Sequence, residues 1–334
     1  MLTQDYSFMR NNLYHSKNLA EHKFLITGGA GFIGSHIVRY LLNNGAGKVR
    51  VLDNFSTGFF KNIEEFTTNA AFELIEGDIR NLQTCVEAID GITFISHQAA
   101  LGSIPRSIAD PLTSNGVNVD GFLNLLYAAK ESGMVDRLVY ASSSSVYGDN
   151  NDNVKIEDNT GRLLSPYAAT KHINELYGHM FAELYGLQTI GLRYFNVFGP
   201  KQNPEGAYAA VIPRFIKAAK NLTPATIYGD GMQSRDFTFV DNVVQANVRA
   251  FFVDDEEAVN QIYNIGCGEK TSVNQLLDKI CALTSCSKNV VYEQSRTGDV
   301  RNSLADISKA KRYIGYEPVV AIDEGLKQTI YSWG

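Results

Sequence analysis

Residues 24–34, Phe-Leu-Ile-Thr-Gly-Gly-Ala-Gly-Phe-Ile-Gly, form the stretch that decides the expected fold of this chain. A short apolar run ends at Thr27, and glycines follow at 28, 31 and 34 where a helical period begins. In such a strand–turn–helix the first glycine permits a tight turn, the second lets the backbone approach a pyrophosphate, and the third allows close helix packing. The free N–H groups of the helix N-terminus attract an anion. The stretch therefore predicts a dinucleotide-binding turn.

Two acidic residues extend this interpretation along the next strands. Asp53 ends the second apolar run, about 20 residues after the glycines, where a carboxylate accepts the adenosine-ribose hydroxyls and repels a 2′-phosphate. This favours NAD over NADP. Asp78 ends the third run and is expected to meet the adenine edge, although a lone acid is more often a solvated loop residue.

Alternating strand-like and helix-like segments indicate the fold class. The apolar runs are 24–27, 49–53, 72–77, 92–97, 137–142 and 187–194, and the helical periods are 32–43, 81–88, 115–132 and 166–185. This order predicts an α/β fold with a doubly wound parallel (Rossmann) sheet. We expect an N-terminal extension over 1–22 and a dinucleotide-binding domain over 23–195. Residues 196–334 should mainly form a smaller, interleaved C-terminal α/β lobe, with some segments returning to the first domain.

Composition limits the possible partners. The 334 residues include 30 Lys and Arg against 36 Asp and Glu, and no block of like charges gives a footprint for nucleic acid or an anionic membrane. No apolar run approaches the length of a membrane span, and residues 1–22 lack the apolar core of a signal peptide, so we expect a cytoplasmic protein. The four cysteines have no metal-site spacing, which predicts structural thiols and no metal.

A serine, a tyrosine and a lysine point to proton-transfer chemistry. The fifth apolar run ends in a serine-rich segment, 142–145, and Ser165-Pro166 is a good helix start. Tyr167 and Lys171 then lie four residues apart on one helix face. For Tyr167 to act as a base near pH 7, its pKa must fall by roughly three units, or about 4 kcal/mol. A nearby cation supplies roughly one to three units, so Lys171 alone is marginal, whereas Lys171 with the positive nicotinamide ring of NAD⁺ suffices.

Longer motifs give the chain a specific resemblance. GGAGFIG (28–34), SPYAATK (165–171), LRYFNVFGP (192–200) and RDFTFVDN (235–242) resemble the UDP-galactose 4-epimerase family of the extended short-chain dehydrogenases/reductases, from about residue 23 onward. HQAALGSIPRS (97–107), GAYAAVIPRF (206–215) and GDVRNSLADISKA (298–310) are more similar to its NAD-dependent UDP-N-acetylhexosamine 4-epimerases of bacterial surface-polysaccharide synthesis.

The resemblance implies reversible epimerisation at carbon 4 of a UDP-hexose, expected to be UDP-GlcNAc/UDP-GalNAc, through a transient 4-keto sugar with retained NAD. It also implies a homodimer formed through helices 115–132 and 166–185. The alternatives are a UDP-glucuronate or UDP-glucose 4-epimerase and, less favoured, a nucleotide-sugar dehydratase or a non-catalytic NAD-binding protein. Dehydratases and decarboxylases of this fold place acids where Ser144 and Ser145 stand here.

The family pattern also assigns expected site residues. Ser143, Tyr167 and Lys171 are the expected catalytic residues. The expected cofactor-binding residues are Gly28, Gly31, Phe32, Ile33, Gly34, Asp53, Asn54, Asp78, Ile79, Gln98, Ala99, Ala100, Asn118, Tyr167, Lys171 and Tyr194. The expected substrate-binding residues are Gly102, Ser103, Ser143, Ser144, Asn196, Ala210, Val211, Thr226, Ile227, Tyr228, Arg235, Arg296, Asp299 and Ser303.

Three groups of substrate residues have distinct expected roles. Arg235 and Arg296 match the diphosphate ligands of the family, and guanidinium groups pair well with phosphate oxygens. Asp299 matches a ligand of the uridine ribose, while 210–211 and 226–228 match the segments that hold the uracil. The small residue Ser303 matches a position that admits an N-acetyl group, and a tyrosine there accompanies turnover of plain UDP-hexoses.

Overall fold

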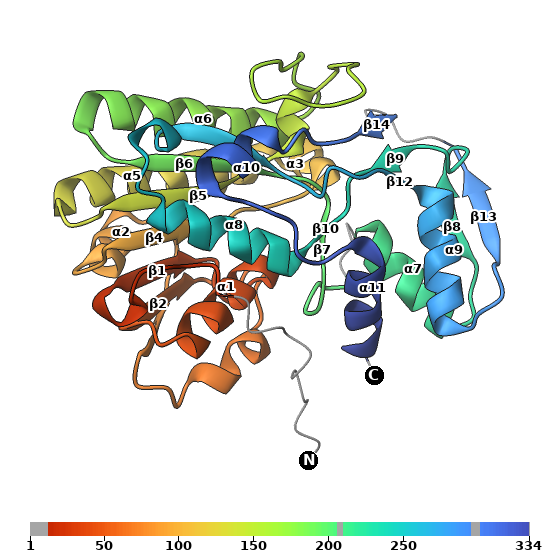
Figure 1. The fold of residues 1–334 in the computed structure, drawn as a ribbon, viewed down its shortest axis with the longest axis horizontal. Coiled ribbons are helices and arrows are strands. Elements are labelled where there is room, and N and C mark those ends of the chain that lie inside the picture. The colour runs from red at the N-terminus through yellow and green to blue at the C-terminus, as the bar shows by residue number, and fades with distance from the viewer. Residues whose placement is uncertain (1–12, 206–209, 295–300, 334) are drawn as a thin grey trace.

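Seven parallel strands form the central sheet of the computed structural model, which describes residues 13–205, 210–294 and 301–333 (Figure 1). Their order is β11-β6-β5-β4-β1-β2-β3. The strands are β1 (Lys23–Thr27), β2 (Lys48–Asp53), β3 (Phe72–Glu76), β4 (Phe94–His97), β5 (Arg137–Ser143), β6 (Thr189–Tyr194) and β11 (Gln261–Ile265). Ile26 at the sheet centre pairs with Val51 on one side and Ser96 on the other. The predicted doubly wound sheet is confirmed.

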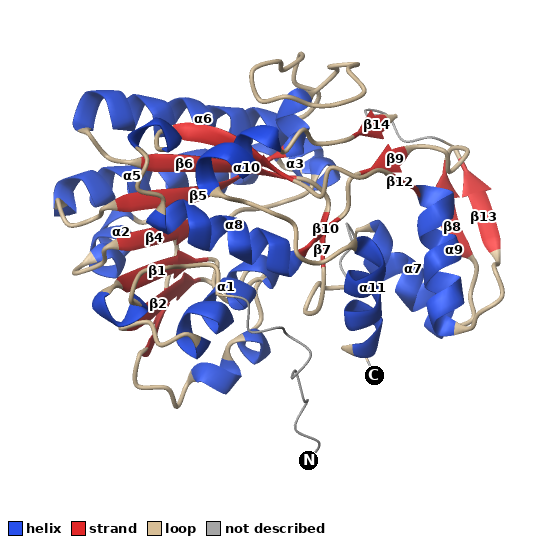
Figure 2. Cartoon of the chain, in the orientation of Figure 1, coloured by secondary structure: helices blue, strands red, loops and turns tan. Residues whose placement is uncertain are grey.

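Helices cover both faces of this sheet, which explains why its strands are apolar along their length. Helices α2 (Leu82–Ile89), α5 (Gly121–Ser132) and α6 (Pro166–Tyr185) pack on one face, and α1 (Phe32–Asn43), α8 (Val240–Phe252) and α10 (Ser308–Ile314) pack on the other (Figure 2). Phe122 and Phe181 belong to the first of these hydrophobic cores, and Ile37 and Val248 belong to the second. The carboxyl ends of the strands remain open between the two helical layers.

A smaller group of elements, on the right in Figure 1, has a third hydrophobic core. Its helices are α7 (Val211–Lys220), α9 (Val273–Thr284) and α11 (Ile322–Tyr331). Its strands are β8 (Ala225–Tyr228) with β13 (Val290–Glu293), and β12 (Thr271–Ser272), β9 (Ser234–Arg235) and β14 (Asn302–Ser303) in one sheet. Between the two parts, β7 (Val197–Phe198) pairs with β10 (Thr238–Phe239). We call this group the second lobe.

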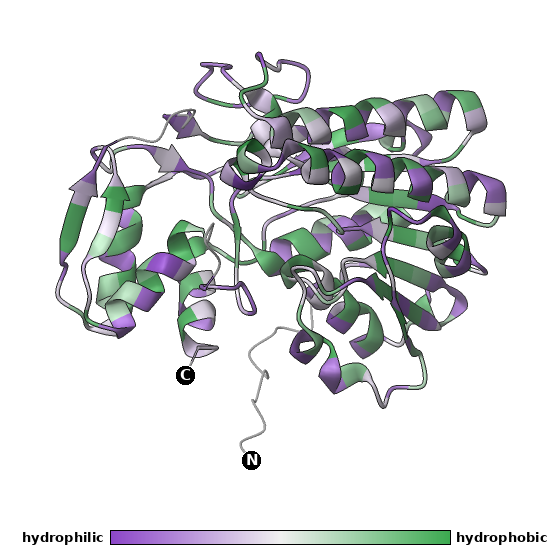
Figure 3. Cartoon of the chain, turned by 180° about the vertical axis from the view of Figure 1, so that it is seen from behind, coloured by the Kyte–Doolittle hydropathy of each residue, from purple (hydrophilic) through white to green (hydrophobic). Residues whose placement is uncertain are grey.

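The chain enters the second lobe and returns to the large sheet before it ends. Strand β11 pairs along its whole length with β6, so that Tyr263 lies opposite Leu192. Helices α8 and α10 pack against that region of the sheet. Figure 3 shows hydrophobic residues concentrated on the strands and on the inner faces of the helices. The large core is therefore built from two separate stretches of the sequence.

The sequence predicts one helix over 115–132, but the structure shows that this segment is not one regular helix. Short helices α3 (Ile104–Ala109) and α4 (Pro111–Asn115) precede a π-helical turn over Gly116–Asp120, and α5 follows. The side chain of Asn118 in this turn accepts a hydrogen bond from Leu101 N at 2.8 Å and donates to Leu101 O at 3.2 Å. The wider turn thus lets one side chain bind the segment that follows β4.

Residues 13–22 of the predicted N-terminal extension pack on the α1 and α8 side of the sheet. The Tyr14 ring stacks on Tyr40 with a centroid distance of 5.0 Å, and Tyr14 N donates to the Tyr40 hydroxyl at 2.7 Å. Lys17 forms an ion pair with Asp254 at 2.9 Å. Among the helices in the described ranges, none combines the length and apolar character needed to cross a bilayer.

Candidate active site

A cavity of about 710 Å³ lies at the carboxyl ends of the strands. Its wall begins at the glycine-rich turn, passes the ends of β2 to β6, and reaches Arg235 and Ser303 of the second lobe. Parallel α/β sheets bind ligands at this edge, at the point where the strand order changes direction. Here that point lies between β1 and β4, because β2 and β3 follow on one side and β5 and β6 on the other. The cavity is therefore the place at which the predicted cofactor and substrate residues can meet.

The glycine-rich turn fits closely against the segment after β4. Gly28 has a φ of +68°, and a Cβ there would lie 2.7 Å from Ala99 N. A Cβ on Gly34 would collide with the carbonyl oxygen of Gly28. Gly31 is the N-cap of α1, and no side chain caps that end of the helix. The first turn of α1 therefore presents its N–H groups toward the cavity, as a phosphate-binding turn requires.

Asp53 is held rigidly at the end of β2. Its Oδ2 accepts a hydrogen bond from Ala30 N at 2.9 Å, and its Oδ1 accepts one from Phe55 N at 2.8 Å. Burial raises the pKa of Asp53, and these two backbone donors oppose that change. Each carboxylate oxygen retains acceptor capacity on the cavity side, as a ribose ligand needs.

Asp78 lies at the same rim and is tied to two neighbours. Arg80 contacts it with Nη2 at 2.7 Å and Nε at 3.0 Å, and Asn54 Nδ2 donates to it at 2.8 Å. The hydrogen bonds from Arg80 lower the pKa of Asp78 to about 2. Asp78 and Asn54 both line the cavity, so the structure brings these predicted residues together.

These features fit NAD in both shape and charge. The close glycine turn leaves room for a pyrophosphate, the uncapped N-terminus of α1 attracts its charge, and Asp53 stands where the adenosine ribose would follow. In the part of the chain that the structure describes, no cluster of three or more His, Cys, Asp or Glu side chains could hold a metal ion.

The predicted catalytic tyrosine is positioned by the start of α6. Ser165 Oγ accepts a hydrogen bond from Ala168 N at 3.1 Å and Pro166 is the first helical residue, so the predicted helix start is confirmed. Tyr167 N also donates to Ser107 Oγ of α3 at 3.0 Å. Burial raises the pKa of Tyr167 above its usual value, and the neighbouring side chain of Ser143 opposes that rise. Both residues line the cavity.

Lys171 lies one turn further along α6 and is almost completely buried. Its Nζ donates to the carbonyl oxygen of Ala141 at 2.7 Å, and burial lowers its pKa to about 8. Nearby His97 has its pKa lowered to about 3, mainly by burial and further by Lys171. Without a bound ligand, the groups of the protein therefore leave the pKa of Tyr167 above its usual value. A low pKa for Tyr167 requires additional positive charge close to the ring, as the sequence had suggested.

A buried ion pair supports the catalytic strand from behind. Glu175 of α6 binds Arg193 of β6 through two bonds of 2.8 and 2.9 Å, and Ser142 Oγ donates to the same carboxylate. Burial alone would raise the pKa of Glu175, but its hydrogen bonds, chiefly from Arg193, hold the pKa below its usual value. Its negative charge also favours the protonated form of Lys171.

Several predicted substrate-binding residues, including two of the second lobe, also line the cavity. Arg235 of β9 and Ser303 of β14 lie directly opposite each other in a parallel pair, and both line the wall. Asn196 and Ser103, which also line it, have φ values of +31° and +109°. Such strained backbone in residues other than glycine is concentrated at functional sites.

Most of the predicted site residues meet at this one cavity. Besides those described above, the wall includes the predicted residues Phe32, Ile33, Ile79, Gln98, Ala100, Gly102, Ser144 and Tyr194. Asn118 lies behind the wall, where it also donates to Thr170 Oγ1 at 3.1 Å. Ala210 and Val211 at the start of α7, and Thr226, Ile227 and Tyr228 on β8, belong to the second lobe away from the cavity wall. Arg296 and Asp299 lie outside the described residues.

Asp236 and Lys155 also contribute to the site, although the sequence did not predict them. Asp236 is fully buried and accepts hydrogen bonds from Cys267 N at 2.7 Å and Gly268 N at 2.9 Å, which fixes the strand that carries Arg235. Burial raises the pKa of Asp236 to about 6. Lys155 lines the cavity, while its Nζ binds the carbonyl oxygens of Asn150 and Asp152. An acid beside a predicted ligand was the available signal for Asp236, whereas nothing marked Lys155 within its polar loop.

Fold and site together define an NAD-binding enzyme of the short-chain dehydrogenase/reductase type. The sequence profile of the NAD dependent epimerase/dehydratase family matches residues 24–266. The chain belongs to this family.

Individual relatives are similar to this protein over almost the whole length of the chain. A UDP-glucose 4-epimerase of Mycolicibacterium smegmatis is 37% identical over 308 residues, which cover 92% of this chain and 96% of the relative. The UDP-N-acetylglucosamine 4-epimerase of Methanobrevibacter ruminantium, solved with UDP-N-acetylmuramic acid, is 37% identical with a TM-score of 0.88, covering 93% of this chain and 98% of that one. The UDP-glucuronic acid 4-epimerase of Bacillus cereus, solved with UDP-glucuronic acid and NAD, is 31% identical with a TM-score of 0.87 over the same shares.

Proposed function

We propose that this protein interconverts two UDP-hexoses that differ at carbon 4, with NAD as a retained cofactor. The observation that carries the proposal is that Ser143, Tyr167 and Lys171 line one cavity, with Ser143 beside Tyr167, and that this cavity also reaches Arg235. The three relatives named above all carry 4-epimerase names, although their sugars differ. The proposal therefore concerns carbon 4 first and the identity of the sugar second.

The residues of the chain divide the work of this reaction. The glycine-rich turn and Asp53 would hold NAD, which when bound would supply the acceptor for the hydride of carbon 4 and would later return that hydride. Ser143 holds the 4-oxygen by a hydrogen bond, and Tyr167 takes the 4-hydroxyl proton and later returns it. Lys171 contributes positive charge beside the phenolate. Arg235 binds the diphosphate, so the 4-keto sugar stays tethered while it presents its other face.

The cavity wall favours epimerisation over dehydration. Within the described wall, the carboxylates are those of Asp53 and Asp78, and both lie at the rim beside the glycine-rich turn. Ser144 and Ser145 occupy the strand end beside the catalytic serine. A dehydratase needs a further acid or base at carbon 5 or 6, and serine does not supply one at neutral pH.

For the sugar, we propose UDP-GlcNAc and UDP-GalNAc, with UDP-glucuronate or plain UDP-glucose as the alternative. Ser303 contributes only a small side chain to the cavity wall, which would leave room for an acetamido group, and Ser144 on the same wall offers a hydroxyl for the amide of that group. Synthesis of surface-polysaccharide precursors in the cytoplasm is the corresponding cellular proposal.

We also propose a homodimer formed through α5 and α6. These helices expose large apolar side chains, and the exposed fractions of Leu176, Met180 and Leu184 are 51%, 47% and 65%. A hollow between the two helices is lined by Tyr127, Tyr177 and their neighbours. Exposed apolar patches of this kind mark association surfaces, and two-fold dimers are the commonest oligomers.

The deciding experiment is to incubate the purified protein separately with UDP-GlcNAc, UDP-glucose and UDP-glucuronate and to resolve the products by chromatography. We expect UDP-GalNAc from the first substrate at the highest kcat/KM, and no loss of activity without added NAD. A 4,6-dehydrated product, or no conversion of any of the three by protein that contains NAD, would contradict the proposal.

A further inference from the structure

Lys201 is a buried cation outside the proposed chemistry, at the point where the chain leaves the large sheet for the second lobe. Its backbone adopts a φ of +67°, a left-handed conformation that is costly for a residue other than glycine. Its side chain is only 13% exposed. Burial, followed by the charge of Arg39, lowers its pKa to about 8. A strained backbone and a buried charge at the same residue indicate that its ammonium group has a specific task.

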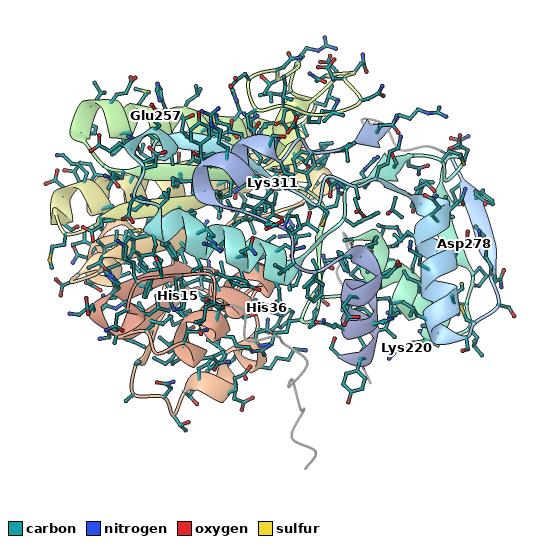
Figure 4. All side chains as sticks on the ribbon, viewed as in Figure 1. His15, His36, Lys220, Glu257, Asp278 and Lys311 are labelled. Atoms are coloured by element: carbon teal, nitrogen blue, oxygen red, sulfur yellow. The ribbon has the colours of Figure 1, made fainter. Side chains whose placement is uncertain are left out.

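The side chain of Lys201 reaches across to the segment that follows β2. Its Nζ donates to the carbonyl oxygen of Asn62 at 2.6 Å and to Glu65 Oε1 at 3.2 Å. The same Glu65 oxygen accepts a bond from Arg39 of α1 at 2.7 Å. Beside these contacts, His36 of α1, labelled in Figure 4, pairs its Nε2 with Pro200 O at 3.0 Å. The entrance to the second lobe is thus bound to α1 and to residues 62–65.

Asn62 continues the connection into the glycine-rich turn. Its Nδ2 donates to Ala30 O at 2.8 Å, and Phe59 N donates to the same carbonyl oxygen at 3.0 Å. Ala30 N in turn binds the carboxylate of Asp53. Within the segment 54–66, Ser56, Thr57 and Gly58 line the cavity. Hydrogen bonds that are linked through residues Asn62 and Ala30 therefore connect Lys201 with the two features that would hold the adenosine half of NAD.

We propose that Lys201 is a positioning residue that fastens the segment 54–66 against the glycine-rich turn and thereby slows the release of NAD. The inference rests on the proposed placement of NAD in this cavity. A cofactor that is reduced and reoxidised within each turnover must not leave while reduced, because the keto sugar would then have no hydride to recover. Slow release is therefore a requirement of the proposed reaction, and Lys201 supplies part of it from outside the site.

The test compares release of the reduced cofactor from wild type, Lys201→Met and a control, Lys217→Met, which loses an exposed lysine paired with Glu205 at 2.8 Å. Each protein is loaded with NADH and mixed rapidly with excess NAD, and the loss of NADH fluorescence gives the dissociation rate. Lys201→Gly is measured alongside, because glycine adopts a φ of +67° without strain and so removes the amine while relieving the backbone.

We expect both Lys201 variants to release NADH about tenfold or more faster than wild type, since each loses hydrogen bonds made by a charged group. Lys217→Met should match wild type. Deuterium exchange of 54–66 should rise in the Lys201 variants, and turnover with saturating NAD should stay within about twofold of wild type. If Lys201→Met folds poorly, the rate of NADH release from Lys201→Gly alone tests the proposal.

Release from folded Lys201→Gly at the wild-type rate, or equal acceleration in Lys217→Met, would overturn the inference. The NADH measurement needs no sugar substrate and is therefore independent of the proposed activity. A wild-type protein that binds NADH but converts no UDP-hexose would overturn the proposed function and leave the Lys201 comparison intact.

Discussion

Replacing Lys171 by methionine tests how the protein makes a base of Tyr167. Burial raises the pKa of Tyr167, and the neighbouring side chain of Ser143 opposes that rise. Lys171 is the buried cation one helical turn away, held by Ala141 O at 2.7 Å. Methionine keeps an unbranched side chain, shorter by one atom, and removes its charge. Because a nearby cation lowers a pKa by roughly one to three units, its loss should raise the barrier by about 1.4–4 kcal/mol.

The assay is the pH dependence of kcat/KM for UDP-GlcNAc. A base must be deprotonated to act, so a higher pKa for Tyr167 moves the acid limb of the profile to higher pH. We expect that limb to move up by at least about one unit, with a loss of roughly tenfold to a thousandfold at pH 7 that narrows as the pH rises. Lys279→Met, which removes an exposed lysine paired with Asp323 at 2.6 Å, is the matched control and should leave the profile unchanged.

Stability must be measured in the same variant, because methionine leaves the Ala141 carbonyl without its donor at a cost of roughly 1–3 kcal/mol. Thermal melting therefore has to show that the variant is folded at the assay temperature. An active, folded Lys171→Met with the acid limb of wild type would refute the charge argument. A uniform loss at every pH would instead indicate that Lys171 positions the cofactor without tuning the base.

Four other expectations are open to direct measurement. Ser303→Tyr should keep turnover of UDP-glucose and lose that of UDP-GlcNAc, because the ring fills the proposed acetamido space; equal losses in a kinetic comparison would exclude that space. Glu175→Gln should lower the free energy of unfolding by roughly 3–5 kcal/mol, since Arg193 is left buried without its counter-charge, and a urea titration showing no change would contradict this. Protein stripped of cofactor and reloaded with NADP should turn over at less than about a tenth of its rate with NAD, because Asp53 repels the 2′-phosphate, and equal rates would disprove that selectivity. Sedimentation should give a dimer for wild type and the 36.9 kDa monomer for Leu184→Glu, while a monomeric wild type would remove the proposed interface.

The large sheet and its first functional turn could be predicted because their signals are local. The strand before Thr27, the glycines after it and the helix start at Ser165 each depend on residues that are adjacent in sequence. The break within 115–132 could not be predicted in this way. It arises because Asn118 binds the backbone of Leu101, which lies 17 residues earlier in the chain.

The second lobe was predictable only in outline because its strands are short and pair with distant partners. Arg235 lies opposite Ser303 in a pair of strands that are two residues long, and Asp236 accepts hydrogen bonds from the backbone N–H groups of Cys267 and Gly268. The periodicity of the sequence cannot reveal contacts of this kind. Arg235 and Ser303 were therefore predicted as site residues only from the resemblance to a family. Lys201 illustrates the same limit, since only the folded chain shows that it reaches Asn62.

The return of the chain to the large sheet affects how the protein can be made. Strand β6 is complete at residue 194, yet the neighbour that covers its edge, β11, begins only at residue 261. A nascent chain therefore carries an open, apolar edge strand while the ribosome adds the intervening residues. Unpaired edges of this kind template aggregation. Truncated products that end inside the second lobe should consequently depend on chaperones. One continuous deletion that removes the second lobe also removes β11 and so exposes β6.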